Sequence, residues 1–187
     1  MKVLLVSGSA RRGSTNTAAL RTAAQLADPD VEAALYDDLL KLPLFHPDAD
    51  QEGVPQHPQV ALMRRQVSEA DALLICTPEY AGALPAALKN VLEWTIGDAG
   101  TYRKPTAWIN VSGLASPTGG ADAHASLRKV LNYAGADIVE AACLRVPLTR
   151  DMIEGTGVVA DEDSRSQIAE AVRILAAHVR GAGPSGA

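Results

Sequence analysis

Residues 3–27 read VLLVSGSARRGSTNTAALRTAAQLA, an apolar run that leads through a small, polar and basic loop into a segment rich in alanine and leucine. The apolar run at 3–6 predicts a short buried strand, and the apolar residues of 17–27 recur at helical spacing. The loop at 7–16 therefore joins a strand to the start of a helix. The rest of the chain continues this order of strand, loop and helix.

Four more strands and four more helices are predicted after residue 27. The strands are expected at 31–36, 72–76, 106–111 and 138–144, and the helices at 57–70, 84–95, 121–134 and 163–179. The segment 31–36 is more polar than the others, which indicates a strand at the edge of the sheet. Residues 37–53 are interrupted by Pro43 and Pro47 and predict a long irregular connection.

Strands that are almost wholly apolar and alternate with helices predict a parallel sheet covered on both faces. Five strands in 187 residues suit a three-layer, doubly wound α/β fold. We expect a single domain at 1–180 and a disordered tail at 181–187. In such folds ligands bind beyond the carboxyl ends of the strands, so the loops after the first, third and fourth strands form the candidate site.

The composition is that of a soluble globular protein, with 47% hydrophobic and 21% charged residues. A net charge of −5 at pH 7 leaves no basic footprint for nucleic acid and disfavours binding to anionic membranes. The chain opens without a signal-peptide pattern, and no apolar run reaches the roughly 18 residues of a membrane span. We therefore expect a cytoplasmic protein with neither nucleic acid nor membrane as a partner.

The cysteines and histidines predict neither a disulfide framework nor a metal site. Cys76 and Cys143 each end an apolar run and are interpreted as small buried hydrophobic residues, with a redox or disulfide role as the alternative. The four histidines are scattered without metal-ligand spacing and are interpreted as surface residues: His46, His57, His124 and His178.

The loop at 7–16 predicts an anion site. It has no P-loop or dinucleotide fingerprint, but it places hydroxyl groups and the arginines Arg11 and Arg12 directly before a helix. A helix N-terminus presents free N–H groups and a partial positive charge, and an arginine adds a charge-assisted bond to phosphate. The alternative is a helix start capped by Ser14 or Asn16, with both arginines in solvent.

The other two loops could contact the remainder of a ligand, one through an aromatic side chain and the other through backbone N–H groups. TPEYAGAL at 77–84 contains Tyr80, one of only seven aromatic residues, which either stacks on a flat ring or packs on the following helix. SGLASPTGG at 112–120 either wraps a ligand with backbone N–H groups or is a flexible connector. No loop pairs a nucleophile with a base. The set therefore points to a cofactor that carries its own chemistry, with no catalytic side chain.

Three motifs resemble those of the NAD(P)H-dependent FMN reductases of the flavodoxin-like superfamily, which include quinone, azo-dye and chromate reductases. GSARRGSTN at 8–16 follows their G-S-x-R-x-x-S-x-N pattern. PEY at 78–80 is followed by LKN at 88–90 and EW at 93–94, as in the family. The glycines at 119–120 and Leu-Arg at 127–128 resemble the family's glycine-rich loop and the helix after it. The likeness covers roughly residues 1–180.

The resemblance implies a flavodoxin-like α/β/α sandwich with strand order 2-1-3-4-5 and a bound FMN. The FMN phosphate would be held by Ser9, Arg11, Ser14, Thr15, Asn16 and Thr17. The ring would lie between Pro78, Glu79, Tyr80, Ala81 and Gly82 on one side and Ser112, Gly113 and Gly119 on the other. Arg12 is left for solvent or the incoming nicotinamide nucleotide. Ala81, Ala83 and Ala86 depart from the family, which often has Asn, Ser and Gly there, so backbone donors are expected.

The same resemblance implies that hydride passes from NADPH or NADH through FMN to a small acceptor such as a quinone, an azo compound or free flavin. It also implies a homodimer or homotetramer packed partly through the helix of Lys89, Asn90 and Trp94. The alternative is a flavodoxin-like electron carrier, against which Arg11, Arg12 and the modest net charge argue. A third interpretation is an anion-binding or regulatory protein that takes up no FMN.

Overall fold

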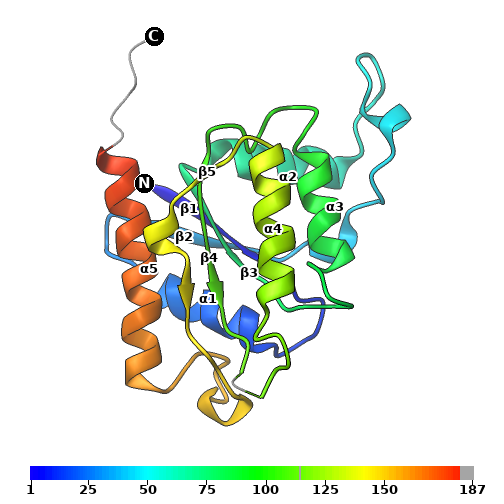
Figure 1. Ribbon diagram of the computed structural model, residues 1–187. Helices are drawn as coiled ribbons and strands as arrows, with labels where there is room; N and C mark the ends of the chain where they lie inside the picture. Colours follow the sequence, from blue (N-terminus) through cyan, green and yellow to red (C-terminus); the bar gives the residue numbers. More distant parts are fainter. Residues whose placement is uncertain (114, 182–187) are drawn as a thin grey trace.

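Strand β1 (Lys2–Ser7) lies inside a parallel sheet, between β2 (Glu32–Tyr36) and β3 (Ala72–Cys76). The computed structural model describes residues 1–113 and 115–181 (Figure 1). Strand β4 (Pro105–Asn110) pairs with β3, and β5 (Asp137–Ile138) pairs with β4, so the order is 2-1-3-4-5. All these pairs are parallel, and β2 is an edge strand, which confirms the predicted α/β sheet and its order.

The predicted fifth strand at 138–144 is wrong as a continuous element. A 3-10 turn at Glu140–Ala142 divides it into β5 and β6 (Leu144–Arg145), which pair in succession along β4. The turn closes the hydrogen bonds from Ala142 N to Val139 O and from Cys143 N to Glu140 O. It also places Glu140 in an ion pair with Arg128. An apolar run alone gives no sign of such a turn.

Five α-helices cover the sheet: α1 (Thr15–Leu26), α2 (Pro58–Glu69), α3 (Ala86–Trp94), α4 (Ala121–Tyr133) and α5 (Glu162–Gly181). Each matches a predicted helix within two residues at its ends. Figure 1 shows α1 and α5 on one face of the sheet and α2, α3 and α4 on the other. The molecule therefore has the three layers that the alternation of elements predicts.

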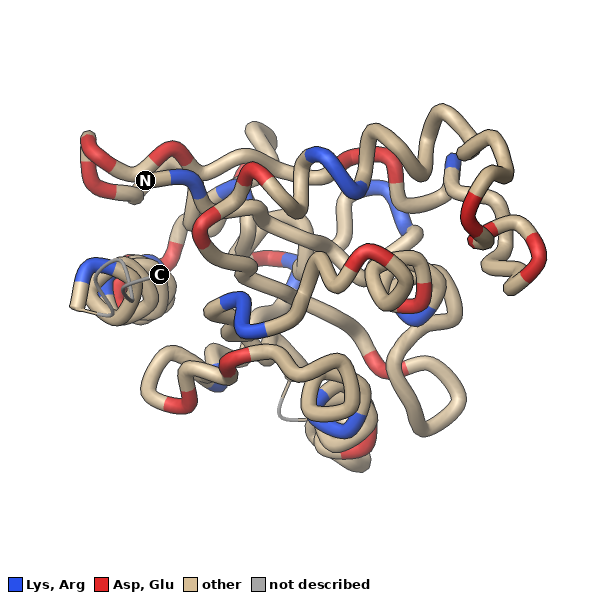
Figure 2. The backbone as a smooth tube through the Cα atoms, turned by 90° about the horizontal axis from the view of Figure 1, so that it is seen from above, with Lys and Arg blue, Asp and Glu red and all other residues tan. Residues whose placement is uncertain are grey.

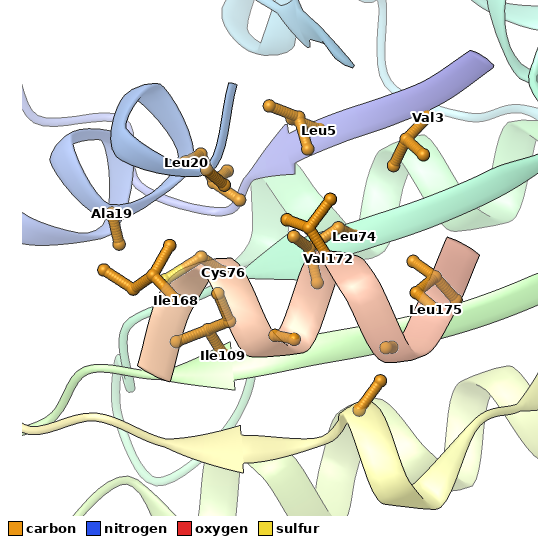
Figure 3. Packing of buried hydrophobic residues seen from close by; sticks show 14 of the residues in the cluster. Val3, Leu5, Ala19, Leu20, Leu74, Cys76, Ile109, Ile168, Val172 and Leu175 are labelled. Atoms are coloured by element: carbon orange, nitrogen blue, oxygen red, sulfur yellow. The ribbon is translucent and has the colours of Figure 1, made fainter. Parts of the chain in front are cut away.

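Alternate side chains of the strands pack into two separate cores, one on each face of the sheet, because successive residues of a strand point to opposite faces. Val3 and Leu5 lie in the core under α1 and α5, whereas Leu4 and Val6 lie in the core under α2, α3 and α4. Figure 3 shows Leu20 of α1 and the α5 residues Ile168, Val172 and Leu175 among the strand side chains of the first core. Few aromatic residues are needed, because branched aliphatic side chains fill this layer.

The long connection after β2 is irregular, as predicted, and is held in place by side chains of two helices. Asn90 of α3 accepts from Phe45 N at 2.7 Å and donates to Pro43 O at 2.9 Å, and Trp94 Nε1 donates to the same oxygen. Arg64 of α2 pairs with Asp50 at 2.7 Å. Asn90 and Trp94 are thus buried within the chain, and only Lys89 of the three predicted interface residues is free to face a second copy.

Charged residues are interspersed along the helices and connections, as Figure 2 shows. Within residues 1–113 and 115–181, none of the helices combines the length and hydropathy that a membrane span requires. Gly181, the first residue of the predicted tail, ends α5, and residues 182–187 lie outside the described part of the chain.

Candidate active site

A cavity of about 420 Å³ opens beyond the carboxyl ends of β1, β3 and β4. In Figure 1 the loops that follow these strands lie at the lower end of the sheet, around the start of α1. This volume is within the range of small-molecule sites, roughly 300–1,000 Å³. The residues around it are Ser9, Arg11, Ser14, Thr15, Asn16, Pro78, Glu79, Tyr80, Val111, Ser112, Gly113, Ser116 and Leu148.

Ser14 fixes the start of α1 at one end of the cavity. Its hydroxyl accepts a hydrogen bond of 3.1 Å from Thr17 N, which makes it the N-cap residue. The Thr17 hydroxyl is in turn bonded to Ser7 at 2.8 Å. The helix start is therefore tied to the end of β1, and Thr17, predicted to bind phosphate, has its hydroxyl engaged within the protein rather than in this cavity.

The first turn of α1 leaves two donors for a ligand. The N–H groups of Thr15 and Asn16 have no acceptor among the described residues, as the geometry of a helix start requires. Arg11 lines the same end of the cavity, and no described carboxylate lies within ion-pair distance of it. Since two N–H groups, one guanidinium and the dipole of α1 converge here, this end of the cavity suits an anion.

Asn16 is held from below by a cysteine. Its Oδ1 accepts a hydrogen bond of 3.4 Å from the Sγ of Cys76, the last residue of β3. Burial raises the pKa of the Cys76 thiol, so the group is a protonated donor rather than a thiolate. Cys76 is thus the small buried residue that its apolar run predicts, whereas Cys143 is only partly buried.

The second loop ends in a tight turn that sets the position of Tyr80. Tyr80 and Ala83 exchange backbone hydrogen bonds of 3.0 and 3.2 Å, with Ala81 at φ 52° and Gly82 at φ 70° between them. Two successive residues with positive φ form the turn typical of a two-residue hairpin. Tyr80 is 45% exposed and borders the cavity, rather than being packed under a helix. Ala81 and Gly82 lie at the tip of the turn and do not line the cavity.

Glu79 joins the second loop to the third. Its Oε1 accepts a hydrogen bond of 2.8 Å from the Thr118 hydroxyl, and its Oε2 accepts one of 3.2 Å from Ala123 N in the first turn of α4. Gly120, the N-cap residue of α4, has no side chain to supply this bond. The carboxylate therefore caps α4 from outside the helix and sets the spacing of the two loops around the cavity.

The described part of the glycine-rich loop is fixed rather than loosely connected. Asn110, the last residue of β4, accepts from Ser112 N at 2.9 Å and donates to Gly119 O at 2.8 Å, so it holds both ends of the loop. Gly119 and Gly120 adopt positive φ, and a Cβ on Gly120 would lie 2.3 Å from the Ser112 hydroxyl. Gly119 itself faces Arg145 and does not line the cavity.

His124 is buried, so its prediction as a surface residue is wrong. Its side chain lies against Trp108, and its Nδ1 donates to Gly120 O at 2.7 Å. Nε2 is buried and has no partner among the described residues. Burial lowers the pKa of this imidazole, which is therefore neutral and carries its proton on Nδ1.

The structure brings together ten of the fourteen predicted site residues and adds three that were missed. Thr17, Ala81, Gly82 and Gly119 lie outside the cavity, for the reasons given above. Val111, Ser116 and Leu148 line it without having been predicted. Ser116 belongs to the third loop, and Val111 follows β4 directly. Leu148 follows β6, the second half of the predicted fifth strand. Ligands bind beyond the carboxyl ends of parallel strands, so including the loop after the fifth strand among the candidate loops would have found this residue.

The two ends of the cavity differ in chemistry, and together they suit FMN. The α1 end offers hydroxyl groups, backbone N–H groups and Arg11, which fit a phosphate. The other end is bordered by Pro78, Tyr80 and the apolar side chains of Val111 and Leu148, which fit a flat ring. Among the described residues, no group of three or more His, Cys, Asp or Glu side chains is placed to hold a metal.

Comparison with known proteins agrees with this geometry. Residues 1–148 match the family model described as NADPH-dependent FMN reductase. The chain belongs to the NADPH-dependent FMN reductase family. Its members are FMN-dependent NAD(P)H oxidoreductases, so this flavodoxin-like protein is an enzyme whose cofactor is FMN and whose co-substrate is NAD(P)H.

Two curated proteins similar to this member of the family span nearly the whole chain. It is 32% identical over 182 residues to an NAD(P)H-dependent FMN reductase of Pseudomonas aeruginosa, with 96% of each chain covered. It is 33% identical over 184 residues to a 2-hydroxy-1,4-benzoquinone reductase of a Burkholderia species, with 96% of this chain and 97% of that protein covered.

Solved structures confirm the fold of the FMN reductase family for this chain. FerB, a flavoenzyme NAD(P)H:(acceptor) oxidoreductase from Paracoccus denitrificans, superposes with a TM-score of 0.81 at 23% identity, with 96% of this chain and 97% of FerB covered. A flavodoxin from Pseudomonas aeruginosa gives a TM-score of 0.59 at 19% identity over 94% of this chain and 99% of the flavodoxin. These identities support the shared fold alone.

Proposed function

We propose that the cavity beyond β1, β3 and β4 is the FMN site and that the enzyme uses NAD(P)H to reduce quinones. The observation that carries the proposal is that the free N–H groups of Thr15 and Asn16 lie with Arg11 at one end of a cavity whose other end is bordered by Pro78 and Tyr80. Bound FMN supplies the hydride-carrying chemistry there. The similarity to a benzoquinone reductase supports a quinone as acceptor.

The residues of the chain then bind and orient the cofactor and exclude water. Arg11, Ser9 and the N–H groups at the start of α1 hold the phosphate. Pro78 and Tyr80 border one side of the ring, while Ser112 and Gly113 close the other side. No described side chain in the cavity pairs a nucleophile with a base, so positioning and electrostatics are the contribution of the protein.

Steady-state assays test this proposal. The protein reconstituted with FMN is expected to show a bound-flavin spectrum and to oxidise NADPH or NADH in the presence of 1,4-benzoquinone well above the rate of free FMN. The same assay separates the enzyme from an electron carrier. A protein that binds FMN but turns over no faster than free FMN would contradict the proposal, and a colourless protein that takes up no FMN would contradict the site.

We also propose a homodimer that packs through the groove between α3 and α4. The groove is apolar and is lined by Lys89, Leu92, Glu93, Ile96, Lys129, Val130 and Tyr133. Tyr133 is 88% exposed and Ile96 is 45% exposed, so two large apolar side chains lie together at this groove on the surface. Light scattering should give twice the chain mass for the wild type and a monomer for Tyr133→Glu. A monomeric wild type would contradict this interface.

The cytoplasmic location stays a prediction. Cys76 and Cys143 are free thiols in the structure, which supports a reducing compartment. Detection of the protein in the cytoplasmic fraction of the source cells tests it, and detection outside the cytoplasm would contradict it.

A further inference from the structure

A second groove, of about 480 Å³, begins where the phosphate end of the first cavity stops. Ser9 and Arg11 line both spaces. The groove continues along the outer side of the first loop, the exposed face of α1 and the segment after β2. Its other residues are Ala10, Arg12, Gly13, Thr17, Arg21, Asp37, Leu39, Leu40 and Lys41. None of the residues after β2 belongs to the site derived above.

The basic side chains of this groove outnumber the acidic ones. Arg11, Arg12 and Arg21 have no ion-pair partner among the described residues, and the one carboxylate that faces them is Asp37. Lys41 is already paired with Asp38 at 2.7 Å. The groove therefore keeps a surplus of positive charge in a chain whose net charge is −5. Such a local surplus favours an anionic ligand.

The arrangement of the arginines suits a phosphate group in particular. Thr17 and Arg21 are four residues apart on α1 and share one face of the helix. Arg12 approaches the same groove from the loop before α1. A guanidinium offers paired N–H donors that match two oxygens of a phosphate. A ligand that carries a hydroxyl group in place of the phosphate has no use for such a pair of donors. Gly157 lies beside the Arg21 guanidinium, where a Cβ would approach its Nη1 to 2.9 Å, so this position leaves room for the arginine.

The remaining wall of the groove is apolar. Leu39 is buried and forms the base, and Leu40 is 69% exposed beside it. A phosphate-binding rim next to an apolar wall is the combination that a phosphorylated nucleoside needs, because its base is flat and largely apolar on its faces. The shared lining at Ser9 and Arg11 connects this space to the cavity where the nicotinamide must meet the flavin.

We propose that this groove binds the 2′-phosphoadenosine half of NADPH and makes the enzyme selective for NADPH over NADH. The inference rests on the proposed function of the adjoining cavity. Arg12 and Arg21 hold the 2′-phosphate, and Leu40 covers one face of the adenine. Asp37 opposes the phosphate, because a carboxylate in this environment favours the free 2′-hydroxyl of NADH instead. Arg12 and Arg21, which the FMN phosphate does not engage, face one carboxylate, and this balance of charge decides the preference for NADPH.

Two measurements on the FMN-loaded full chain test this inference. Steady-state assays with 1,4-benzoquinone give kcat/KM for NADPH and for NADH, and calorimetric titration gives the affinity for 2′,5′-ADP and for 5′-ADP. The wild type is expected to prefer NADPH and to bind 2′,5′-ADP more tightly than 5′-ADP. Arg12→Ala and Arg21→Ala should each lower the ratio of NADPH to NADH kcat/KM about 10-fold or more and weaken 2′,5′-ADP binding by a similar factor.

Asp37→Asn and Arg65→Ala complete the design. Asp37→Asn should tighten 2′,5′-ADP binding about two- to five-fold, since it removes the opposing charge. Arg65 is an exposed arginine of α2 that lines neither cavity, so Arg65→Ala controls for the loss of one positive charge and should leave the ratio unchanged. Arg12→Ala keeps the test decisive if Arg21→Ala disturbs the contact with Gly157.

The outcomes separate this inference from the proposed function. A wild type that uses NADH as well as NADPH, or arginine variants that leave both the ratio and the 2′,5′-ADP affinity unchanged, would overturn the groove assignment. A wild type that oxidises neither coenzyme would overturn the proposed function. In that case 2′,5′-ADP binding that depends on Arg12 and Arg21 still upholds the groove, and the absence of such binding overturns it as well.

Discussion

The Oε2 atom of Glu79 lies 3.2 Å from the backbone nitrogen of Ala123, so a residue of the loop after β3 caps the helix that follows β4. The same carboxylate accepts a bond of 2.8 Å from Thr118. Two of the three loops around the cavity are thus joined by one side chain. This arrangement gives the P-E-Y motif a structural role beside any contact with the flavin.

Glu79→Ala should lower the free energy of unfolding by about 1–3 kcal/mol, because it leaves an N–H of α4 unpaired and removes a charged acceptor. Glu79→Gln keeps an acceptor oxygen and should lose about half as much. Urea denaturation of the apoprotein measures both. Asp122→Ala is the matched control, since Asp122 is the acidic residue within the first turn of α4 itself. Equal losses for Glu79→Ala and Asp122→Ala would show that only the helix dipole is involved.

Arg11→Ala should weaken FMN binding about 10- to 150-fold, because a hydrogen bond to a charged group contributes about 1.5–3 kcal/mol. The dissociation constant is read from the quenching of flavin fluorescence in a titration of the apoprotein. Arg65→Ala is expected to bind FMN like the wild type. Riboflavin, which lacks the phosphate, should bind Arg11→Ala and wild type equally. A loss of riboflavin affinity as large as that of FMN would contradict the phosphate role.

Gly8→Ala should destabilise the protein by about 1–3 kcal/mol, because an added Cβ would lie 2.3 Å from Thr77 Oγ1 and 2.8 Å from Thr77 Cβ. Gly8 N also bonds to Cys76 O at 2.9 Å, so the loops after β1 and β3 meet at this point and have little freedom to move apart. Gly155→Ala is the control, since its added Cβ meets nothing within 4 Å. Thermal denaturation should show a lower Tm for Gly8→Ala only.

Ala81→Asn should stabilise the protein by about 0.5–1 kcal/mol. Ala81 adopts φ 52°, which an alanine tolerates poorly, and Asn followed by Gly is the pair preferred in a two-residue hairpin turn with positive φ at both positions. A rise in Tm of a few degrees is expected. Ala83→Asn serves as the control, because Ala83 lies outside the two positive-φ positions. An unchanged or lower Tm for Ala81→Asn would contradict this explanation.

Much of the fold could be predicted from the sequence, because the apolar strands and their helices are strongly periodic. The segment 72–76 was predicted to the residue, and α1 to α5 differ from the prediction only at their ends. The interruption at Glu140–Ala142 could not be predicted, since its two local turn hydrogen bonds leave no mark on an apolar run and the Arg128 ion pair is a tertiary contact. Periodicity reports which face of an element is apolar, not where a strand turns.

The site could be predicted where it follows a motif and not where it depends on contacts between distant segments. Arg11 and Tyr80 line the cavity, as the motifs of their loops predict. Leu148 was missed because the loop after the fifth strand had not been considered. The groove beside Asp37 was missed because the loop after β2 had not been considered. His124 was misread, since nothing in its neighbours along the chain shows that Trp108 and Gly120 enclose it.

His124 makes the stability of the protein depend on pH in a defined direction. Burial holds the pKa of its imidazole in the folded state below 6.5, whereas the imidazole of the unfolded chain titrates near 6.5. As the pH falls through about 6.5, the unfolded chain takes up a proton that the folded state does not bind. The free energy of unfolding therefore decreases over this window, until the pH reaches the pKa of the folded state and the contribution is fully lost.

His124→Gln isolates this contribution, because its amide still offers a donor to Gly120 O and does not titrate. Urea denaturation of both proteins between about pH 8 and pH 5 gives the difference in stability at each pH. The wild type should lose stability relative to His124→Gln as the pH falls below about 6.5, while the two run parallel above about 7.5. A difference that stays constant over the whole range would show that the imidazole titrates alike in the folded and unfolded states.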